Sequence, residues 1–160
     1  MNLEFVSAYD KREEIGGLFK AYTDMLVEGS PEFKNYLNLQ NYDEELNTLT
    51  ERYGEPEGRL YAAYLDGVLC GCIGLKKFDE NNCELKRFYI KPEFRGKGLG
   101  KVFVDKIVEE AKKSGYKAIL LDTLPFLETA IALYRKKGFK DIESYNGSPM
   151  ENLVYLKLEL

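Results

Sequence analysis

The chain has 160 residues, enough for one domain with a substantial buried core. Hydrophobic residues make up 44% of it and charged residues 31%, a globular composition that excludes a fibrous or disordered chain. There is no histidine, which excludes His-based catalytic triads and zinc sites of the HExxH type, and the net charge of −4 argues against a strongly basic nucleic-acid surface.

The start of the chain and its cysteine count bear on where the protein works. The first residues, MNLEF, do not pair a basic region with an apolar stretch, so we expect no secretion signal. No apolar run approaches the roughly 18 residues of a transmembrane helix. The three cysteines, an odd number, do not suggest a disulfide framework. We therefore expect one domain over residues 1–160 in the cytoplasm, binding neither membrane nor nucleic acid.

Two of the cysteines form a CxC pair within a predicted strand. Because side chains alternate along a strand, Cys70 and Cys72 are expected on the same face of the sheet. Such a pair can bind a metal, but the sequence offers no evident third ligand. We expect small core side chains and no metal site.

The first half of the chain predicts a strand, two helices and a three-stranded meander. Residues 3–7 suggest the strand, and apolar residues recur at helical spacing over 10–28 and 43–53. Asp66-Gly67 is a favoured hairpin turn between strands at 59–65 and 68–77. Another turn at Asn81-Asn82 leads into a strand over 83–90.

The second half predicts a crossover. A glycine-rich loop precedes an amphipathic helix that ends near Gly115, and a short apolar strand follows at 118–122. A helix over 127–137 and an alternating strand over 154–160 complete the chain. The whole is an α/β fold of the α+β kind: a central, mostly antiparallel mixed sheet flanked by helices.

The glycine-rich loop, RGKGLG at residues 95–100, suits a phosphate. Glycines let the backbone approach a ligand closely, and the N-terminus of the following helix favours negative charge. The spacing matches neither the P-loop nor the dinucleotide fingerprint. The alternative is a flexible turn with basic residues on a solvated surface.

Two motifs together resemble a known family. Arg95-x-x-Gly98-x-Gly100 after a strand, followed by ALYRKKGF at residues 132–139, resembles the GCN5-related N-acetyltransferases, or GNAT family. The run CELKRFYIKP at residues 83–92 is similar to the family's fourth strand, and the order of elements fits nearly the whole chain. The full pattern is similar to small bacterial acetyltransferases, most of them without an assigned substrate.

The resemblance implies the GNAT fold, with fourth and fifth strands that splay apart, and acetyl-CoA as co-substrate. The pantetheine arm would lie in the gap and pair with the backbone of Phe88, Tyr89 and Ile90. Arg95 would add positive charge beside the pyrophosphate. The pyrophosphate itself would be held by Gly96, Lys97, Gly98, Leu99, Gly100 and Lys101.

The implied reaction is direct acetyl transfer to a primary amine of a small molecule or protein. The amine must lose a proton, and without histidine the base must be a carboxylate or a water chain ending on one. Glu84 is the first candidate, because family members often place a base on this strand, and Asp122 is the second. Each is alternatively a structural carboxylate, paired with Lys86 or Arg87 or capping a turn.

The resemblance also implies a general acid. Tyr134 matches the tyrosine that protonates the departing thiolate in many family members, although a helix tyrosine half in the core is the alternative. Several members carry an Asn that contacts pantetheine where this chain has Leu127, so the resemblance does not imply that contact here.

Other functions and the acceptor stay open in the sequence. A non-catalytic acyl-CoA sensor, and transfer to a hydroxyl or of a longer acyl group, are the alternatives. Residues 25–53 and 145–150 are expected to contact the acceptor, and tyrosines such as Tyr36, with the chain's acidity, would suit a cationic amine. The C-terminal strand could serve a homodimer.

Overall fold

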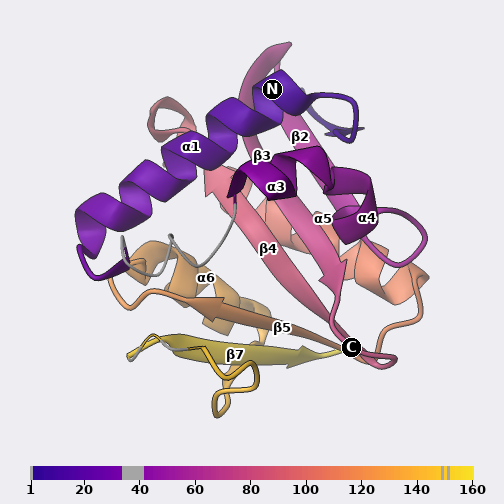
Figure 1. Cartoon of the computed structure of the whole chain (residues 1–160), viewed down its shortest axis with the longest axis vertical. Coiled ribbons are helices and arrows are strands. Elements are labelled where there is room, and N and C mark those ends of the chain that lie inside the picture. Colours follow the sequence, from indigo (N-terminus) through magenta and orange to yellow (C-terminus); the bar gives the residue numbers. More distant parts are fainter. Residues whose placement is uncertain (1, 34–41, 149, 151) are drawn as a thin grey trace.

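A seven-stranded sheet forms the centre of the computed structural model, with strand order β1-β2-β3-β4-β5-β7-β6 (Figure 1). The structure describes residues 2–33, 42–148, 150 and 152–160. Neighbouring strands pair antiparallel except β4 and β5, which pair parallel, so the predicted mixed sheet is confirmed. The strands are β1 (Leu3–Ser7), β2 (Arg59–Leu65), β3 (Val68–Lys77), β4 (Asn82–Ile90), β5 (Ala118–Thr123), β6 (Lys140–Asp141) and β7 (Val154–Glu159).

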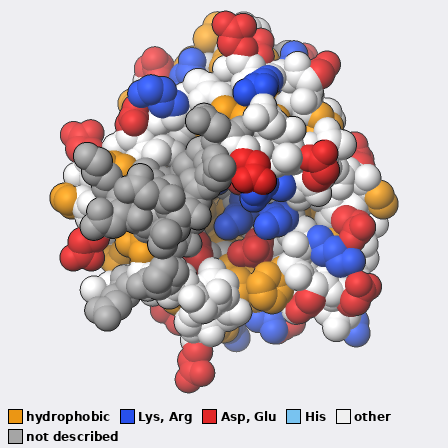
Figure 2. Space-filling view, in the orientation of Figure 1, with side chains coloured by type: hydrophobic (Ala, Val, Ile, Leu, Met, Phe, Trp, Pro, Cys, Tyr) orange, Lys and Arg blue, Asp and Glu red, His pale blue; other side chains and the backbone are white. Residues whose placement is uncertain are grey.

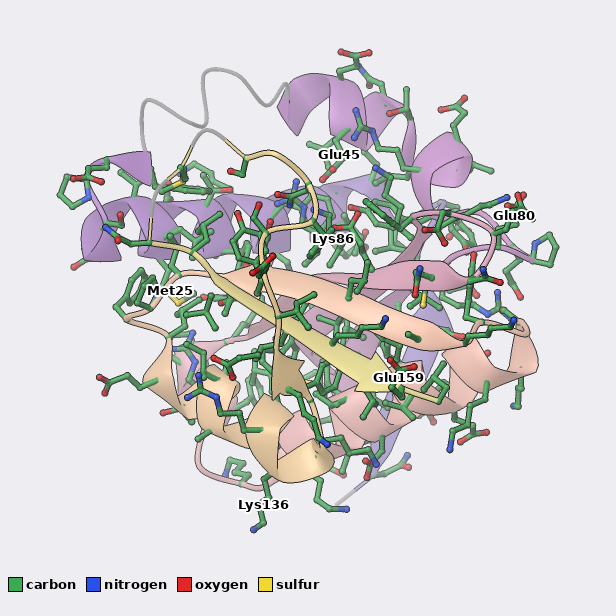
Figure 3. The ribbon with its side chains drawn as sticks, turned by 90° about the horizontal axis from the view of Figure 1, so that it is seen from below. Met25, Glu45, Glu80, Lys86, Lys136 and Glu159 are labelled. Atoms are coloured by element: carbon green, nitrogen blue, oxygen red, sulfur yellow. The ribbon has the colours of Figure 1, made fainter. Side chains whose placement is uncertain are left out.

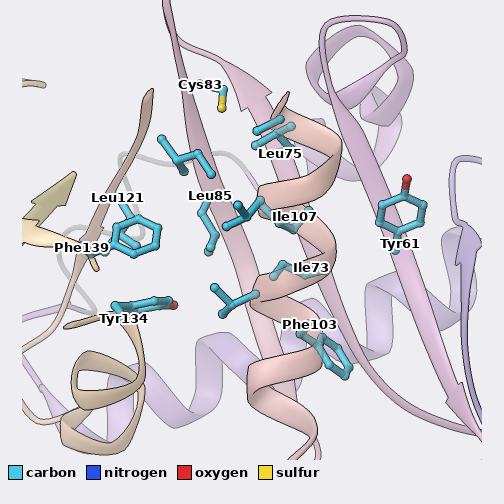
Figure 4. Close-up of a cluster of buried hydrophobic side chains, with 14 of the residues drawn as sticks. Tyr61, Ile73, Leu75, Cys83, Leu85, Phe103, Ile107, Leu121, Tyr134 and Phe139 are labelled. Atoms are coloured by element: carbon cyan, nitrogen blue, oxygen red, sulfur yellow. The ribbon is translucent and has the colours of Figure 1, made fainter. Parts of the chain in front are cut away.

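Helices cover both faces of the sheet, and each face has its own apolar core. Apolar residues of α1 and α4 pack on one face, and those of α5 and α6 on the other. Figure 4 shows Phe103 and Ile107 of α5 packed near Ile73, Leu75 and Leu85 of the sheet. The helices are α1 (Arg12–Gly29), α3 (Tyr42–Asn47), α4 (Leu49–Tyr53), α5 (Leu99–Lys113) and α6 (Glu128–Lys137), with a short 3-10 helix, η1 (Pro92–Phe94). No helix in the described ranges is long and apolar enough to cross a membrane.

The prediction of one helix over residues 43–53 was wrong, because the segment forms two helices that meet at Thr48. The φ of −126° and ψ of 30° at Thr48 are not helical. Its Oγ1 donates a 2.8 Å hydrogen bond to the carbonyl oxygen of Glu44. A threonine side chain that bonds to the backbone competes with regular helix, which explains the break.

The expectation that Cys70 and Cys72 share a face was also wrong. The β2–β3 register shifts between Ala63 and Tyr64, so β3 carries an extra residue there. A β-bulge reverses the alternation of side chains beyond it. Cys70 therefore lies in the core under α5, and Cys72 in the core under α1. Both are buried, as a core role requires.

A second bulge, at Arg87 of β4, prepares the site. Arg87 has a φ of +57°, and the β3–β4 register shifts beside it. β4 pairs with β5 only from Asn82 to Glu84, against Ala118 to Leu120, and beyond these residues the strands diverge. The predicted splay of the fourth and fifth strands is thus present.

Candidate active site

A cavity of about 800 Å³ opens where β4 and β5 diverge. Its wall is built from the second half of β4, the end of β5, the N-terminus of α5, one face of α6 and the end of α1. Most predicted site residues line it, whereas Glu84 and Lys97 do not. The predicted residues along the cavity wall are Phe88, Tyr89, Ile90, Arg95, Gly96, Gly98, Leu99, Gly100, Lys101 and Tyr134.

The glycine-rich loop forms one end of the cavity. Gly96 and Gly98 have φ of +78° and +77°, which only glycine adopts readily, and the space beside both is open. Gly98 is the N-cap of α5, whose first turn holds no acidic residue. The free N–H groups of that turn and the helix dipole favour an anion, so this end of the cavity fits a pyrophosphate.

The edge of β4 forms a second wall. The backbone N–H of Lys91 donates a hydrogen bond to the carbonyl oxygen of Cys70 in β3. Because the backbone groups of successive strand residues point in opposite directions, those of Ile90 point away from β3 and into the gap between β4 and β5. The Ile90 carbonyl oxygen accepts a 2.9 Å hydrogen bond from Nε of Arg95. The Arg95 guanidinium also lies 5.4 Å from the ring centroid of Tyr89. By the same alternation the backbone of Phe88 faces the gap, as an extended pantetheine arm would require. Tyr89, expected to offer its backbone as well, instead pairs with Cys72, so its backbone groups face β3.

Tyr134 reaches the cavity from α6. Its side chain is 5% exposed and packs against Phe88 and Phe139, with ring centroids 6.2 and 5.6 Å away. Among the described residues its hydroxyl has no hydrogen-bond partner, so the proton is available to a ligand. Burial raises the pKa of Tyr134 well above its ordinary value, which keeps the phenol neutral at physiological pH.

The two candidate bases differ in their access to the cavity. Glu84 is 7% exposed, and its Oε2 accepts a 2.8 Å hydrogen bond from the Tyr145 hydroxyl. Asp122, at the end of β5, lines the cavity, and its Oδ2 accepts a 2.6 Å hydrogen bond from Nδ2 of Asn146. The geometry therefore favours Asp122 for direct contact with an acceptor.

Sequence reasoning did not single out several residues of this wall. Lys86, Asn146 and Met150 line the cavity, although the segment of the last two was expected to face the acceptor. Tyr36, expected nearby, lies outside the described residues. Leu127, at the family's Asn position, lines the cavity as an apolar side chain. The CELKRFYIKP run contains Lys86 but does not show that it faces a cavity, and no motif marks Asn146, because folding alone brings β4 beside the segment before β7.

The charge of the wall differs from that of the whole chain. Basic side chains outnumber acidic ones among the described lining residues, despite the net charge of −4. No group of His, Cys, Asp and Glu among the described residues is arranged to hold a metal ion. The ionisable lining residues with basic or acidic side chains are Lys86, Arg87, Arg95, Lys101, Asp122 and Glu128.

Comparison with known proteins places the chain in a family. The model of the Acetyltransferase (GNAT) family matches residues 22–139. An uncharacterized N-acetyltransferase of Schizosaccharomyces pombe is 40% identical over 81% of this chain and 80% of its own length. Another, from Dictyostelium discoideum, is 30% identical over the full length of both chains.

Solved structures show the same fold. The PaiA N-acetyltransferase from Thermoplasma acidophilum, solved in complex with coenzyme A, has a TM-score of 0.77 at 22% identity and covers 100% of both chains. The resemblance expected from the glycine loop and the ALYRKKGF run is therefore confirmed. With a family model over most of its length and relatives of this similarity, the chain belongs to the GNAT family and is an N-acetyltransferase.

Proposed function

We propose that the cavity between β4 and β5 binds acetyl-CoA and that the chain passes the acetyl group directly to a primary amine. One observation carries the proposal: the open glycine loop at the N-terminus of α5, the splayed edge of β4 and the hydroxyl of Tyr134 all meet in one cavity. A coenzyme with a pyrophosphate at one end and a thioester at the other matches this order of groups.

The residues along each wall of the cavity indicate which part of acetyl-CoA they bind. The N–H groups around Gly98 and Gly100 hold the pyrophosphate, with the charge of Lys101 at the cavity edge. The pantetheine arm lies along β4 and pairs with the backbone of Phe88 and Ile90 as an added strand would. Arg95, now bound to the Ile90 carbonyl, turns its charge toward the phosphates when that carbonyl takes a pantetheine amide.

The transfer itself needs one proton acceptor and one proton donor. The neutral amine nitrogen attacks the thioester carbonyl, a C–N bond forms and the C–S bond breaks. The nitrogen loses a proton to a carboxylate and the sulfur gains one, so charge balances over the reaction. Tyr134 donates its hydrogen bond to the developing thiolate, where a neutral donor in a water-poor site has the largest effect.

Asp122 suits the role of proton acceptor best, because it is the candidate carboxylate that lines the cavity. Glu84, the first candidate from sequence, would receive the proton through a bridging water, since its Oε2 is bonded to Tyr145. Substituting each carboxylate in turn distinguishes the roles of Asp122 and Glu84. Asp122→Asn is expected to lower kcat about 100-fold, and Glu84→Gln less, with Glu80→Gln in an exposed turn as the control.

The assay is acceptor-dependent release of free thiol from acetyl-CoA, with the acetylated product identified by mass. The acceptors are free amino acids, polyamines and lysine-containing peptides. We expect thiol release with at least one group and an acetyl group on nitrogen in the product. Tight acetyl-CoA binding without acceptor-stimulated release by any of them would contradict transfer to an amine. Equal activity of the Asp122, Glu84 and Glu80 variants would contradict both carboxylate assignments.

A further inference from the structure

Two neighbouring lysines lie on β3 and β4, and one of them lines the cavity. Lys86 of β4 lines the cavity, and Lys76 of β3 is the cross-strand partner of Glu84, two residues before Lys86. Figure 3 shows Lys86 on the same side of the sheet as Glu45 of α3. Figure 2 shows basic side chains gathered over β4 next to α3, with acidic side chains around them.

One carboxylate faces both lysines, and it is already engaged. Oε2 of Glu84 accepts the Tyr145 hydroxyl at 2.8 Å and lies 3.9 Å from Nζ of Lys86, the outer limit of an ion pair. Lys76 makes no ion pair with any residue the structure describes. Burial and the charge of Lys86 lower the pKa of Lys76. The two ammonium groups thus repel each other without a full counter-charge.

The next acidic group cannot neutralise them, because Arg87 and Arg52 already bind it. Glu45, 5% exposed, lies 2.8 Å from Nη2 of Arg87 and 3.7 Å from Nη1 of Arg52. The Tyr53 hydroxyl donates to the same carboxylate. Within this cluster the basic side chains therefore outnumber the acidic ones where water is partly excluded. The cluster consists of Arg52, Lys76, Lys86 and Arg87 with Glu45 and Glu84. Such an arrangement favours binding of an anion.

We propose that Lys86, supported by the charge of Lys76, binds a carboxylate of the acceptor, so that the acceptor is a small amine that also carries a carboxylate. This inference rests on the proposed function. Lys86 and Asp122 line the same cavity from β4 and β5, so one small molecule can present its carboxylate to the first and its amine to the second. The local charge, and not the acidity of the whole chain, then selects the acceptor.

Matched acceptors test this directly. Glycine, phenylalanine, aspartate and glutamate are each compared with their α-carboxamides and, for the acidic pair, also with the side-chain amides. We expect at least one acid to exceed its amide in kcat/KM by about tenfold or more, as a charge-assisted contact requires. Equal rates for every acid and amide would overturn the inference, as would activity with O-phosphoethanolamine and polyamines alone.

Three variants locate the contact. Lys86→Gln is expected to raise the KM for the preferred acid about tenfold and to leave the KM for its amide unchanged. Lys76→Gln changes the acid KM in the same direction but less. Lys136→Gln removes an exposed lysine on α6, across the sheet, and should change neither value (Figure 3). An equal rise in KM for the acid and for its amide in Lys86→Gln would contradict the assignment of Lys86 as the carboxylate contact.

Measuring the affinity for acetyl-CoA distinguishes a failure of this inference from a failure of the proposed function. Each variant is expected to bind acetyl-CoA as the unmodified chain does, which also shows that it folds. Turnover of polyamines with no turnover of any acid leaves the proposed function in place and overturns the carboxylate site. Absence of both acetyl-CoA binding and turnover in the unmodified chain overturns the two together.

Discussion

Tyr134 shows how a single residue acquires its chemistry from its surroundings. The side chain is as buried as a core residue and packs in the cluster under α5, yet its hydroxyl opens on the cavity. Of the two interpretations offered by the sequence, core packing is observed for the ring, whereas proton donation is the role we propose for the hydroxyl. The ring packs in the core, and the side chain lines the cavity in which we propose that acetyl-CoA binds.

Tyr134→Phe tests the donor role. Removing one hydroxyl that has no partner among the described residues should change stability by less than about 1 kcal/mol, whereas kcat should fall about 10- to 100-fold with the acetyl-CoA affinity unchanged. Steady-state kinetics and calorimetry measure the two. Tyr64→Phe, on β2 and outside the cavity, is the control. A kcat equal to that of the control would contradict the role.

At the residue scale, backbone conformation was predictable where it depends on neighbours in the sequence. Gly96 and Gly98 were recognisable because a tight loop before a helix needs glycine at fixed positions. The contact of Asn146 with Asp122 was not recognisable from the sequence, because it joins residues 24 positions apart across a loop without a motif. Glu84 does not line the cavity and is bonded to Tyr145, 61 positions away, a contact that no local pattern shows.

At the scale of elements, the loop before α5 combines a structural requirement with a binding one. The same substitution at two glycines separates these effects. Gly98→Ala should lower the free energy of unfolding by about 1 kcal/mol, because its φ of +77° strains any other residue. Gly17→Ala, in open space within α1, should raise it by about 0.5–1 kcal/mol, because alanine favours helix. Urea denaturation measures both, and equal signs would contradict the assigned backbone conformation.

The ion pair of Arg87 and Glu45 joins α3 to the bulge of β4. Both side chains are nearly buried, at 11% and 7% exposed, so Arg87→Met leaves a carboxylate with less counter-charge in the core. We expect a loss of about 2–4 kcal/mol in the free energy of unfolding. Arg135→Met breaks a surface pair with Asp141 and should cost below about 1 kcal/mol. Equal effects in denaturation would show that the first pair does not hold α3.

Prediction at this scale succeeded for periodic elements and failed at irregular ones. The hairpin at Asp66-Gly67 and the amphipathic α5 follow from local pattern, and both are present. The bulges at Cys70 and Arg87 do not follow from local pattern, because a strand's sequence does not show where it carries one residue more than the strand it pairs with. The splay of β4 and β5 was therefore available only through the family resemblance.

On the scale of the whole molecule, buried tyrosines make stability depend on alkaline pH. Burial raises the pKa of Tyr53, Tyr61, Tyr134 and Tyr145, and that of Tyr116 to about 12. Below a pH of about 10 these groups are protonated in both states and contribute no pH dependence. Above it the unfolded chain loses protons that the folded chain keeps, so stability falls as pH rises.

Burial also raises the pKa of the thiols of Cys70, Cys72 and Cys83. We therefore expect the free energy of unfolding to decline from about pH 8.5, where the thiols of the unfolded chain ionise, and to fall more steeply above about pH 10, where its tyrosines do. Urea denaturation at each pH, with tyrosinate absorbance as a second signal, measures it. Tyrosinate absorbance should appear together with unfolding. Ionisation of most tyrosines in a chain that stays folded would contradict their burial.

The central claim is that the cavity between β4 and β5 binds acetyl-CoA through the glycine loop. Calorimetric titration of the purified chain with acetyl-CoA, and with CoA as its pair, tests it most directly. We expect micromolar binding of both, weakened about tenfold by Gly98→Ala and unchanged by Gly17→Ala. Absence of binding by either ligand, or equal affinity in the two glycine variants, would contradict the assignment of the cavity.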